Sequence, residues 1–254
     1  MAETEAHSRG VALITGGVRG IGLETARQLG RLGFTVVLGA RDGRKGDEAA
    51  RKLLSEDIAA EAIQCDVKLQ ADREATYAHL EARYGKLDVL INNAGVWLES
   101  DSASDESPNR TSSVPPEVLR ETFEVNFFAP VMLTQRLLPL MRRASAARIV
   151  NVSSIHGSLT LHSDPSSVIY PYKYFAYGAS KSALNAFTVQ LAYELRDTQI
   201  KVNAAHPGWV RTEMGGRNAM LDVSEGSRTS VQLATLPPEG PSGGFFYLGE
   251  VLPW

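Results

Sequence analysis

The chain alternates between short apolar runs and longer segments in which apolar residues recur at helical spacing. The apolar runs are typical of strands buried on both faces of a sheet, and they span residues 11–15, 34–38, 59–65, 89–91, 149–152, 201–205 and 245–248. The segments between them predict helices, over residues 21–32, 44–54, 70–84, 117–143, 177–196 and 224–233. Pro130 and Pro139 predict a kink and a late turn in the long fourth helix.

Regular alternation of strands and helices predicts a parallel sheet with right-handed crossovers and helices on both faces. We therefore expect residues 1–254 to form a single doubly wound α/β domain around a seven-stranded parallel sheet. Ligands of such sheets bind beyond the carboxyl ends of the strands. The candidate motifs below each follow a strand, so we expect them to form one shared site.

Some segments interrupt this alternation. Residues 1–9 form a polar N-terminal tail without the apolar stretch of a secretory signal. Residues 99–116 are rich in Ser, Asp and Pro, which predicts a surface loop. Residues 158–176 carry several tyrosines and no regular pattern, so we interpret them as an irregular insertion near the active site.

Composition and charge narrow the function classes. A net charge of -3 over 254 residues is not the positive charge that favours binding to nucleic acid. No segment approaches the ~18 consecutive apolar residues of a membrane span. The single cysteine, Cys65, excludes an internal disulfide and suits the cytoplasm, and we expect it to be a small buried side chain. His156 and His162 have no third ligand at suitable spacing, so we expect no metal site.

A glycine-rich turn lies between the first strand and the first helix, where glycines let a backbone approach a pyrophosphate at the N-terminus of a helix. Its spacing, with Gly16, Gly20 and Gly22, differs from the commoner G-x-G-x-x-G pattern. A plain tight turn is the alternative interpretation. The candidate cofactor contacts in this turn are Gly16, Val18, Arg19, Gly20, Ile21 and Gly22.

Two arginines favour NADP over NAD. NAD enzymes usually place a carboxylate at the end of the second strand, whereas Arg41 stands there and Arg19 lies in the glycine turn. Two guanidinium groups can bind a 2′-phosphate. Asp42 could instead pair with either arginine, and both arginines could simply be solvated.

Two further strand ends carry candidate cofactor contacts. Asp66 and Val67 follow the third strand, where a carboxylate and a backbone group could bind adenine; the alternative is an Asp that caps the next turn. Asn93, Ala94 and Gly95 follow the fourth strand and suit a backbone that passes close to a cofactor. An ordinary turn is the alternative there, because Asn and Gly favour turns.

Tyr177 and Lys181 stand four residues apart and share one face of a helix. A phenol beside a fixed cation loses its proton below the ordinary tyrosine pKa of about 10. Downstream of a dinucleotide-binding turn, this pair predicts acid–base chemistry beside a nicotinamide.

These motifs occur in the order found in short-chain dehydrogenases/reductases, which the chain resembles over about residues 10–250. The resemblance includes Ser153-Ser154 at a strand end, the Tyr177–Lys181 pair and the turn Pro207-Gly208. It implies a Rossmann-type fold. The stretch 206–214 further resembles the carbonyl reductase branch, whose members carry a longer helical insertion before the tyrosine; here Ser154 and Tyr177 are 23 residues apart.

The resemblance implies four catalytic residues, each with its own role. Tyr177 is the general acid/base, and Lys181 lowers its pKa and binds the nicotinamide ribose. Ser154 positions the substrate oxygen, whereas Ser153 should point away because side chains alternate along a strand. Asn126 holds a water that links Lys181 to solvent.

The resemblance also implies contacts near the nicotinamide. These are Pro207, Gly208, Val210 and Thr212, followed by a mobile substrate lid over residues 211–223. The side chains that could line the substrate pocket are Trp97, His156, His162, Tyr170, Tyr172, Tyr174 and Met214.

The sequence thus predicts an NADP(H)-dependent oxidoreductase that reduces a ketone or aldehyde to an alcohol. The alternatives are an NAD-linked alcohol dehydrogenase working oxidatively and a non-catalytic cofactor-binding protein. We expect a small-molecule carbonyl or alcohol as the partner, with no nucleic acid and no membrane. We also expect a cytoplasmic monomer or small homo-oligomer.

Overall fold

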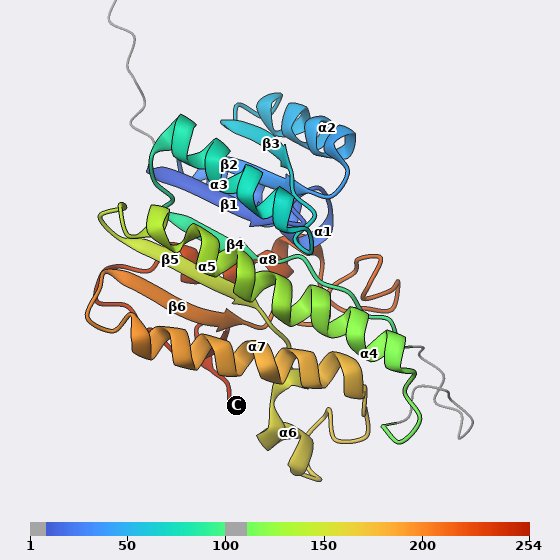
Figure 1. Ribbon diagram of the computed structural model, residues 1–254. Coiled ribbons are helices and arrows are strands. Elements are labelled where there is room, and N and C mark those ends of the chain that lie inside the picture. The colour runs from blue at the N-terminus through green and yellow to red at the C-terminus, as the bar shows by residue number, and fades with distance from the viewer. Residues whose placement is uncertain (1–8, 100–110) are drawn as a thin grey trace, which may run out of the picture.

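Eight strands form one sheet in the order β3-β2-β1-β4-β5-β6-β7-β8 in the computed structural model, which describes residues 9–99 and 111–254 (Figure 1). The strands are β1 Gly10–Thr15, β2 Phe34–Ala40, β3 Ala60–Gln64, β4 Val89–Asn92, β5 Ala147–Val152, β6 Ile200–Ala205, β7 Phe245–Tyr247 and β8 Glu250–Val251. The first seven pair in parallel, as predicted. The two-residue β8 runs antiparallel to β7 and was not predicted.

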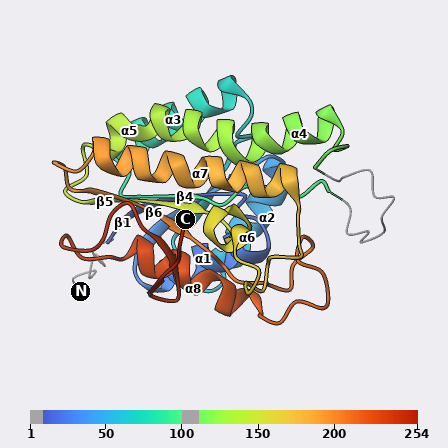
Figure 2. The ribbon, with the colours of Figure 1, turned by 90° about the horizontal axis from the view of Figure 1, so that it is seen from below.

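Helices cover both faces of the sheet (Figure 2). Helices α3, α4, α5 and α7 lie on one side, and α1, α2 and α8 lie on the other. The helix bounds are α1 Gly20–Arg31, α2 Gly43–Leu54, α3 Gln70–Tyr84, α4 Pro116–Phe123, α5 Ala129–Met141, α6 Leu159–Ser163, α7 Phe175–Glu194 and α8 Val223–Ala234. No helix among the described residues is long and apolar enough to cross a bilayer.

Alternation along the strands divides the core into two layers. On β1, Leu13 packs in the layer that contains Leu133 and Leu137 of α5. Its neighbour Ile14 packs in the opposite layer with Leu29 of α1 and others. Both faces of the sheet are therefore buried, which explains why its strands read as continuous apolar runs.

Three local elements differ from the sequence-based expectation. The predicted helix over 117–143 is interrupted by a π-helical turn, Glu124–Phe128, between α4 and α5. The region expected to be irregular, 158–176, contains the short helix α6. Glu99, the first residue of the expected surface loop, is buried, whereas residues 100–110 of that loop lie outside the described residues, as do residues 1–8 of the polar tail.

The sheet reverses its strand order between β1 and β4. β1 pairs with β2 on one side and with β4 on the other, and both pairings are parallel. The chain after β1 and the chain after β4 therefore leave the sheet toward opposite faces, and a crevice lies between the two loops. The glycine turn and the segment that starts at Asn93 form the two sides of this crevice.

Candidate functional site

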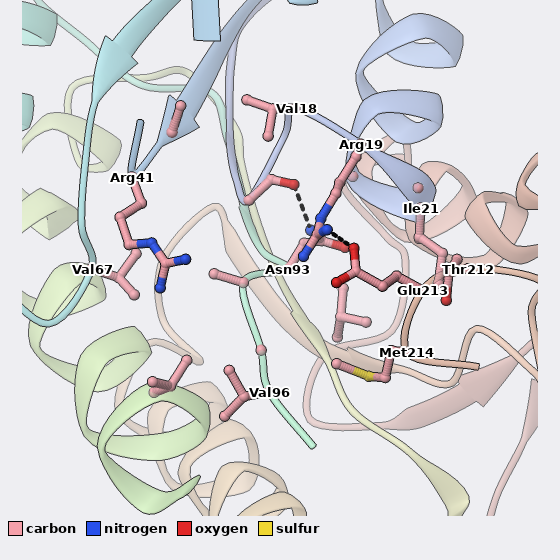
Figure 3. Close-up of a pocket in the computed structure, with 18 of the residues that line it drawn as sticks. Val18, Arg19, Ile21, Arg41, Val67, Asn93, Val96, Thr212, Glu213 and Met214 are labelled. Carbon is pink, nitrogen blue, oxygen red and sulfur yellow. Dashed lines mark hydrogen bonds and ion pairs between the residues drawn. The ribbon is translucent and has the colours of Figure 1, made fainter. Parts of the chain in front are cut away.

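A cavity of about 850 Å³ lies at the carboxyl edge of the sheet (Figure 3). It brings together nearly all of the residues that were predicted to bind a cofactor. Those lining it are Gly16, Val18, Arg19, Gly20, Ile21, Gly22, Arg41, Asp66, Val67, Asn93, Ala94, Gly95, Tyr177, Lys181, Pro207 and Thr212.

The glycine turn is closed tightly against the loop after β4. Gly16 and Gly20 adopt positive φ angles of 62° and 53°, which favour glycine. A Cβ on Gly22 would lie 2.5 Å from the Gly16 carbonyl oxygen. Helix α1 follows without a side-chain cap on its N-terminus, in contrast to α2, which Asp42 caps. Its first N–H groups are therefore available to an anion in the cavity.

Asn93 fastens the loop after β4 to the glycine turn. Its Nδ2 donates to the Thr15 carbonyl at 2.9 Å, and its backbone N–H donates to Thr15 Oγ1 at 3.0 Å. The Ala94 N–H donates to the same hydroxyl at 3.0 Å. Thr15, which sequence reasoning did not single out, therefore sets the distance between the two sides of the crevice.

The two arginines face the cavity from different elements (Figure 3). Arg41 follows β2, and Arg19 precedes α1, where it forms an ion pair with Glu213 that the sequence did not predict. The complication foreseen for Asp42 is resolved, because its carboxylate accepts from the N–H groups of Arg44 and Lys45. Both guanidinium groups thus remain on the cavity wall.

The cofactor contacts predicted after β3 lie on the cavity wall, whereas two of those predicted after β6 do not. Asp66 accepts a hydrogen bond from the Lys68 N–H at 3.1 Å, so it caps the next turn, as the alternative interpretation stated. Asp66 also lines the cavity. Gly208 and Val210 are absent from the cavity wall. The Val210 side chain is buried and packs against Gly226 of α8, so its side chain points away from the expected cofactor contact.

The two serines that follow β5 contact different side chains of α7, and Ser153 lines the cavity whereas Ser154 does not, contrary to the expectation that Ser153 points away. Ser153 donates to Asn185 Oδ1 at 2.6 Å, on the side of α7. Ser154 caps the 3-10 turn Ile155–Gly157 and also forms a hydrogen bond with Tyr177. Ser154 is therefore the serine that lies beside the phenol.

Tyr177 lies in the first turn of α7 and is buried. Burial raises the pKa of Tyr177 to about 12, against a smaller lowering effect of the hydrogen bond from Ser154. The sequence predicted a pKa below the ordinary value, so this expectation is wrong for the protein without a ligand. Desolvation of the phenolate is therefore the dominant effect on this group.

Lys181 lies one turn further along α7 on the same face. Its Nζ is 5.7 Å from the centre of the Tyr177 ring and donates to the Val152 carbonyl at 2.8 Å. Burial lowers the pKa of Lys181 to about 8. The ammonium therefore lies between the tyrosine and the end of β5, on the wall of the cavity.

Asn126 lies in the π-helical turn and is buried. Its Oδ1 accepts from the Val96 N–H at 2.8 Å, and its Nδ2 donates to the Val96 carbonyl at 2.9 Å and to Ser180 Oγ at 3.1 Å. Asn126 thus links the segment after β4 to α7. A Cβ on Gly95 would lie 3.3 Å from Asn126 Oδ1 and 3.7 Å from Lys181 Nζ, so both side chains face the same glycine.

Aromatic side chains surround the phenol. Trp97 stacks on the Tyr177 ring with centroids 5.0 Å apart, and Tyr174 contacts Trp97 edge-on at 4.6 Å. His156 lies 6.2 Å from the Tyr177 ring, and burial lowers its pKa to about 4. Of the predicted pocket residues, these three lie around the phenol, whereas Tyr170 is an exposed side chain.

Sequence reasoning missed several residues of the cavity wall. The charged ones are Lys45, Lys68 and Glu121, whereas Arg211 and Glu213 belong to the predicted lid over residues 211–223. Lys45 lies in the first turn of α2, four residues after Arg41. Glu121 comes from α4, which is distant in sequence, and no local pattern identifies it.

Comparisons with known proteins agree with this geometry. A family model described as short chain dehydrogenase matches residues 10–220. The chain is 33% identical to carbonyl reductase (NADPH) 1 of Mus musculus, over 97% of this chain and 99% of that protein. It is 31% identical to (+)-neomenthol dehydrogenase of Capsicum annuum, over 99% of both.

Solved structures are similar over nearly the whole chain. The NADPH-bound carbonyl reductase from chicken fatty liver has a TM-score of 0.82 at 30% identity, covering 97% of this chain and 99% of that one. A metagenomic short-chain oxidoreductase in complex with NADP has a TM-score of 0.72 at 31% identity, covering 93% and 95%. The chain belongs to the short-chain dehydrogenase/reductase family and resembles its carbonyl reductase branch.

Proposed function

We propose that this protein is an NADPH-dependent reductase that converts a ketone or aldehyde into an alcohol, with Tyr177 as the general acid. The observation that carries the proposal is that Tyr177 and Lys181 line the same cavity as Arg19 and Arg41, with Ser154 hydrogen-bonded to Tyr177. Relatives named as carbonyl reductases support the same reaction class.

The residues of the cavity fit NADP(H). The uncapped N-terminus of α1 suits the pyrophosphate. Arg19 and Arg41 suit a 2′-phosphate, which carries a charge close to that of a phosphorylated side chain, about -1.5 to -2. Two similar structures contain this cofactor by their descriptions, one bound to NADPH and the other to NADP.

Each catalytic side chain then has a defined role in the reaction. Bound NADPH supplies the hydride to the carbonyl carbon. Ser154 donates a hydrogen bond that positions the carbonyl oxygen, and Tyr177 donates its proton to that oxygen. Because the pKa of Tyr177 is high, the phenol remains protonated at neutral pH, as an acid for reduction must. Lys181 is placed to bind the nicotinamide ribose and to stabilise the phenolate that remains.

Asn126 has a positioning task in this proposal. It holds Val96 through two hydrogen bonds, and Val96 lines the cavity beside Gly95. This arrangement keeps the backbone after β4 close to the nicotinamide end of the cavity. Pro207 and Thr212 complete that end from the segment after β6.

An NAD-linked alcohol dehydrogenase working oxidatively is the second candidate among enzymes. The two arginines on the cavity wall disfavour it, because NAD has no phosphate at the ribose 2′ position. A non-catalytic cofactor-binding protein is also disfavoured, because Ser154, Tyr177 and Lys181 are all present and adjacent.

A substrate screen tests the proposed reaction. Purified protein is mixed with NADPH or NADH and a panel of cyclic ketones, aromatic ketones and aldehydes, and loss of the reduced nicotinamide absorbance is followed. We expect turnover of at least one carbonyl class, with kcat/KM at least about tenfold higher for NADPH. Faster turnover with NADH, or oxidation of alcohols without any carbonyl reduction by the protein, would contradict the proposal.

A further inference from the structure

Glu99 is a buried carboxylate in the segment that follows β4. The residue is 6% exposed, although a glutamate is almost never buried unless it is paired. Its two oxygens accept hydrogen bonds from the backbone N–H groups of Ala176, at 3.0 Å, and Tyr177, at 2.8 Å. Glu99 is thus bonded directly to the backbone of the residue proposed as the acid.

These N–H groups belong to the first turn of α7, which begins at Phe175. The first N–H groups of a helix have no partner within the helix. The cap residue, Tyr174, makes no side-chain cap hydrogen bond. Glu99 therefore caps α7 from a segment more than seventy residues away in the chain, since the partners are 77 and 78 positions apart.

The same segment holds Tyr177 at a second point. Trp97, two residues before Glu99, stacks on the phenol ring with an interplanar angle of 14°. Val96 is in turn held by Asn126. Residues 96–99 therefore contact both the backbone and the ring of Tyr177. The first of them, Val96, is hydrogen-bonded to Asn126 in the π-helical turn.

A carboxylate in this position would also act on the phenol. The N-terminus of a helix carries a positive partial charge that favours a phenolate, and a carboxylate placed there opposes it. The other groups around Tyr177 are Lys181 on its own helix and Ser154 and His156 from the turn after β5, with His206 beside His156. In this set Glu99 is the carboxyl group and Lys181 the amino group.

We propose that Glu99 is a positioning residue that fixes Tyr177 and sets the pH dependence of turnover. The inference rests on the proposed function, because it requires Tyr177 to be the group that titrates. Its two components, geometry and charge, are separable by substitution. Glu99→Gln removes the charge and leaves one acceptor oxygen instead of two, and Glu99→Asp keeps the charge and both oxygens but shortens the side chain.

The experiment measures kcat/KM for carbonyl reduction against pH, together with the thermal melting temperature. Reduction needs a protonated phenol, so the rate falls as pH rises through the pKa of Tyr177. In Glu99→Gln the phenolate is no longer opposed by a carboxylate, so this decline moves to lower pH, by on the order of half a pH unit. In Glu99→Asp the decline stays in place, while kcat falls at least about threefold because the helix end shifts.

A matched control is available at the opposite edge of the sheet. Asp88 is also buried and accepts from a backbone N–H, that of Val11, at 2.8 Å, but it precedes β4 rather than following it. Asp88→Asn should lower the melting temperature and leave both kcat and the pH profile unchanged. The control thus shows how the melting temperature, kcat and the pH profile respond to loss of a buried carboxylate that does not contact Tyr177.

The outcomes separate this inference from the proposed function. Turnover by Tyr177→Phe at the wild-type rate would overturn both. If Tyr177→Phe is inactive and Glu99→Gln keeps the wild-type pH profile, only the role of Glu99 is wrong, and it is a helix cap alone. Should Glu99→Gln not fold, unchanged kcat in Glu99→Asp would contradict the inference by itself.

Discussion

At the scale of single residues, the two arginines of the cavity differ in what they must give up to bind a phosphate. Arg19 forms an ion pair with Glu213, with both side chains well exposed. No ion pair is found for Arg41 within residues 9–99 and 111–254. Arg41 can therefore bind a 2′-phosphate without losing a partner, whereas Arg19 must leave Glu213.

We predict that Arg41→Ala weakens NADPH binding about tenfold or more and leaves NADH binding nearly unchanged. A hydrogen bond to a charged group contributes about 1.5–3 kcal/mol, which corresponds to this factor. Fluorescence titration with both cofactors measures the two Kd values. Arg44→Ala is the control, because Arg44 is exposed on α2 and does not line the cavity. Equal losses for NADPH and NADH would contradict the role of Arg41.

The sequence predicted which residues share a helix face better than it predicted their pKa values or their burial. The shared face of Tyr177 and Lys181 follows from helix periodicity alone. The raised pKa of Tyr177 does not, because it depends on burial by side chains such as Trp97. Glu99 was assigned to a surface loop because its neighbours are polar, and only the tertiary fold shows that its carboxylate is buried against α7.

At the scale of elements, the segment 211–223 proposed as a lid is held by its own hydrogen bonds. Trp209 Nε1 donates to the Gly215 carbonyl at 2.8 Å, and the Arg211 N–H donates to the Leu221 carbonyl at 2.8 Å. The Arg19–Glu213 ion pair ties the segment to the glycine turn. We infer that the segment moves as one unit about its two ends.

Hydrogen exchange tests this behaviour. We predict that amides of residues 211–223 exchange faster than those of α8 in the free protein and become protected when NADPH and a carbonyl inhibitor bind. Glu213→Gln should speed exchange in the free protein only modestly, because an exposed ion pair contributes about 0–1 kcal/mol. Strong protection in the free protein that does not change on binding would instead indicate a rigid wall.

Elements with a strong periodic pattern were predicted well, and short ones were not. The seven parallel strands follow from their apolar runs. The two-residue β8 exists only through its pairing with β7, which no local pattern specifies. The π-helical turn was missed because one widened turn hardly alters apolar spacing, although it is the turn that carries Asn126.

At the scale of the whole molecule, two buried neutral histidines link stability to pH. Burial lowers the pKa of both His156 and His206 to about 4. In the unfolded chain each titrates near 6.5. Between these values the unfolded state binds more protons than the folded state, so stability falls as pH decreases from about 6.5 to about 4.

We predict that each histidine contributes on the order of 1–3 kcal/mol to this loss on acidification. His206→Gln should therefore lose less stability than the wild type between pH 6.5 and 4.5, whatever its stability at pH 7. Urea unfolding at several pH values measures the difference. Parallel pH dependences in the two proteins would show that His206 has the same pKa in the folded and unfolded states.

The doubly wound architecture itself could be predicted because it follows from the order of the elements. The crevice between β1 and β4 is a consequence of that order, and it gathered candidate residues that lie far apart in the chain. What could not be predicted are contacts between loops, such as those of Glu99 and Glu213, because their partners are set by the packed fold.

The central claim, that Tyr177 is the acid in an NADPH-dependent carbonyl reduction, is tested most directly by Tyr177→Phe. The change removes one hydroxyl and keeps the ring that stacks on Trp97. We predict that kcat falls at least ~100-fold, as expected for loss of a general acid, while the Kd for NADPH stays within about twofold of the wild type. Retention of more than about a tenth of the wild-type kcat would show that another group donates the proton.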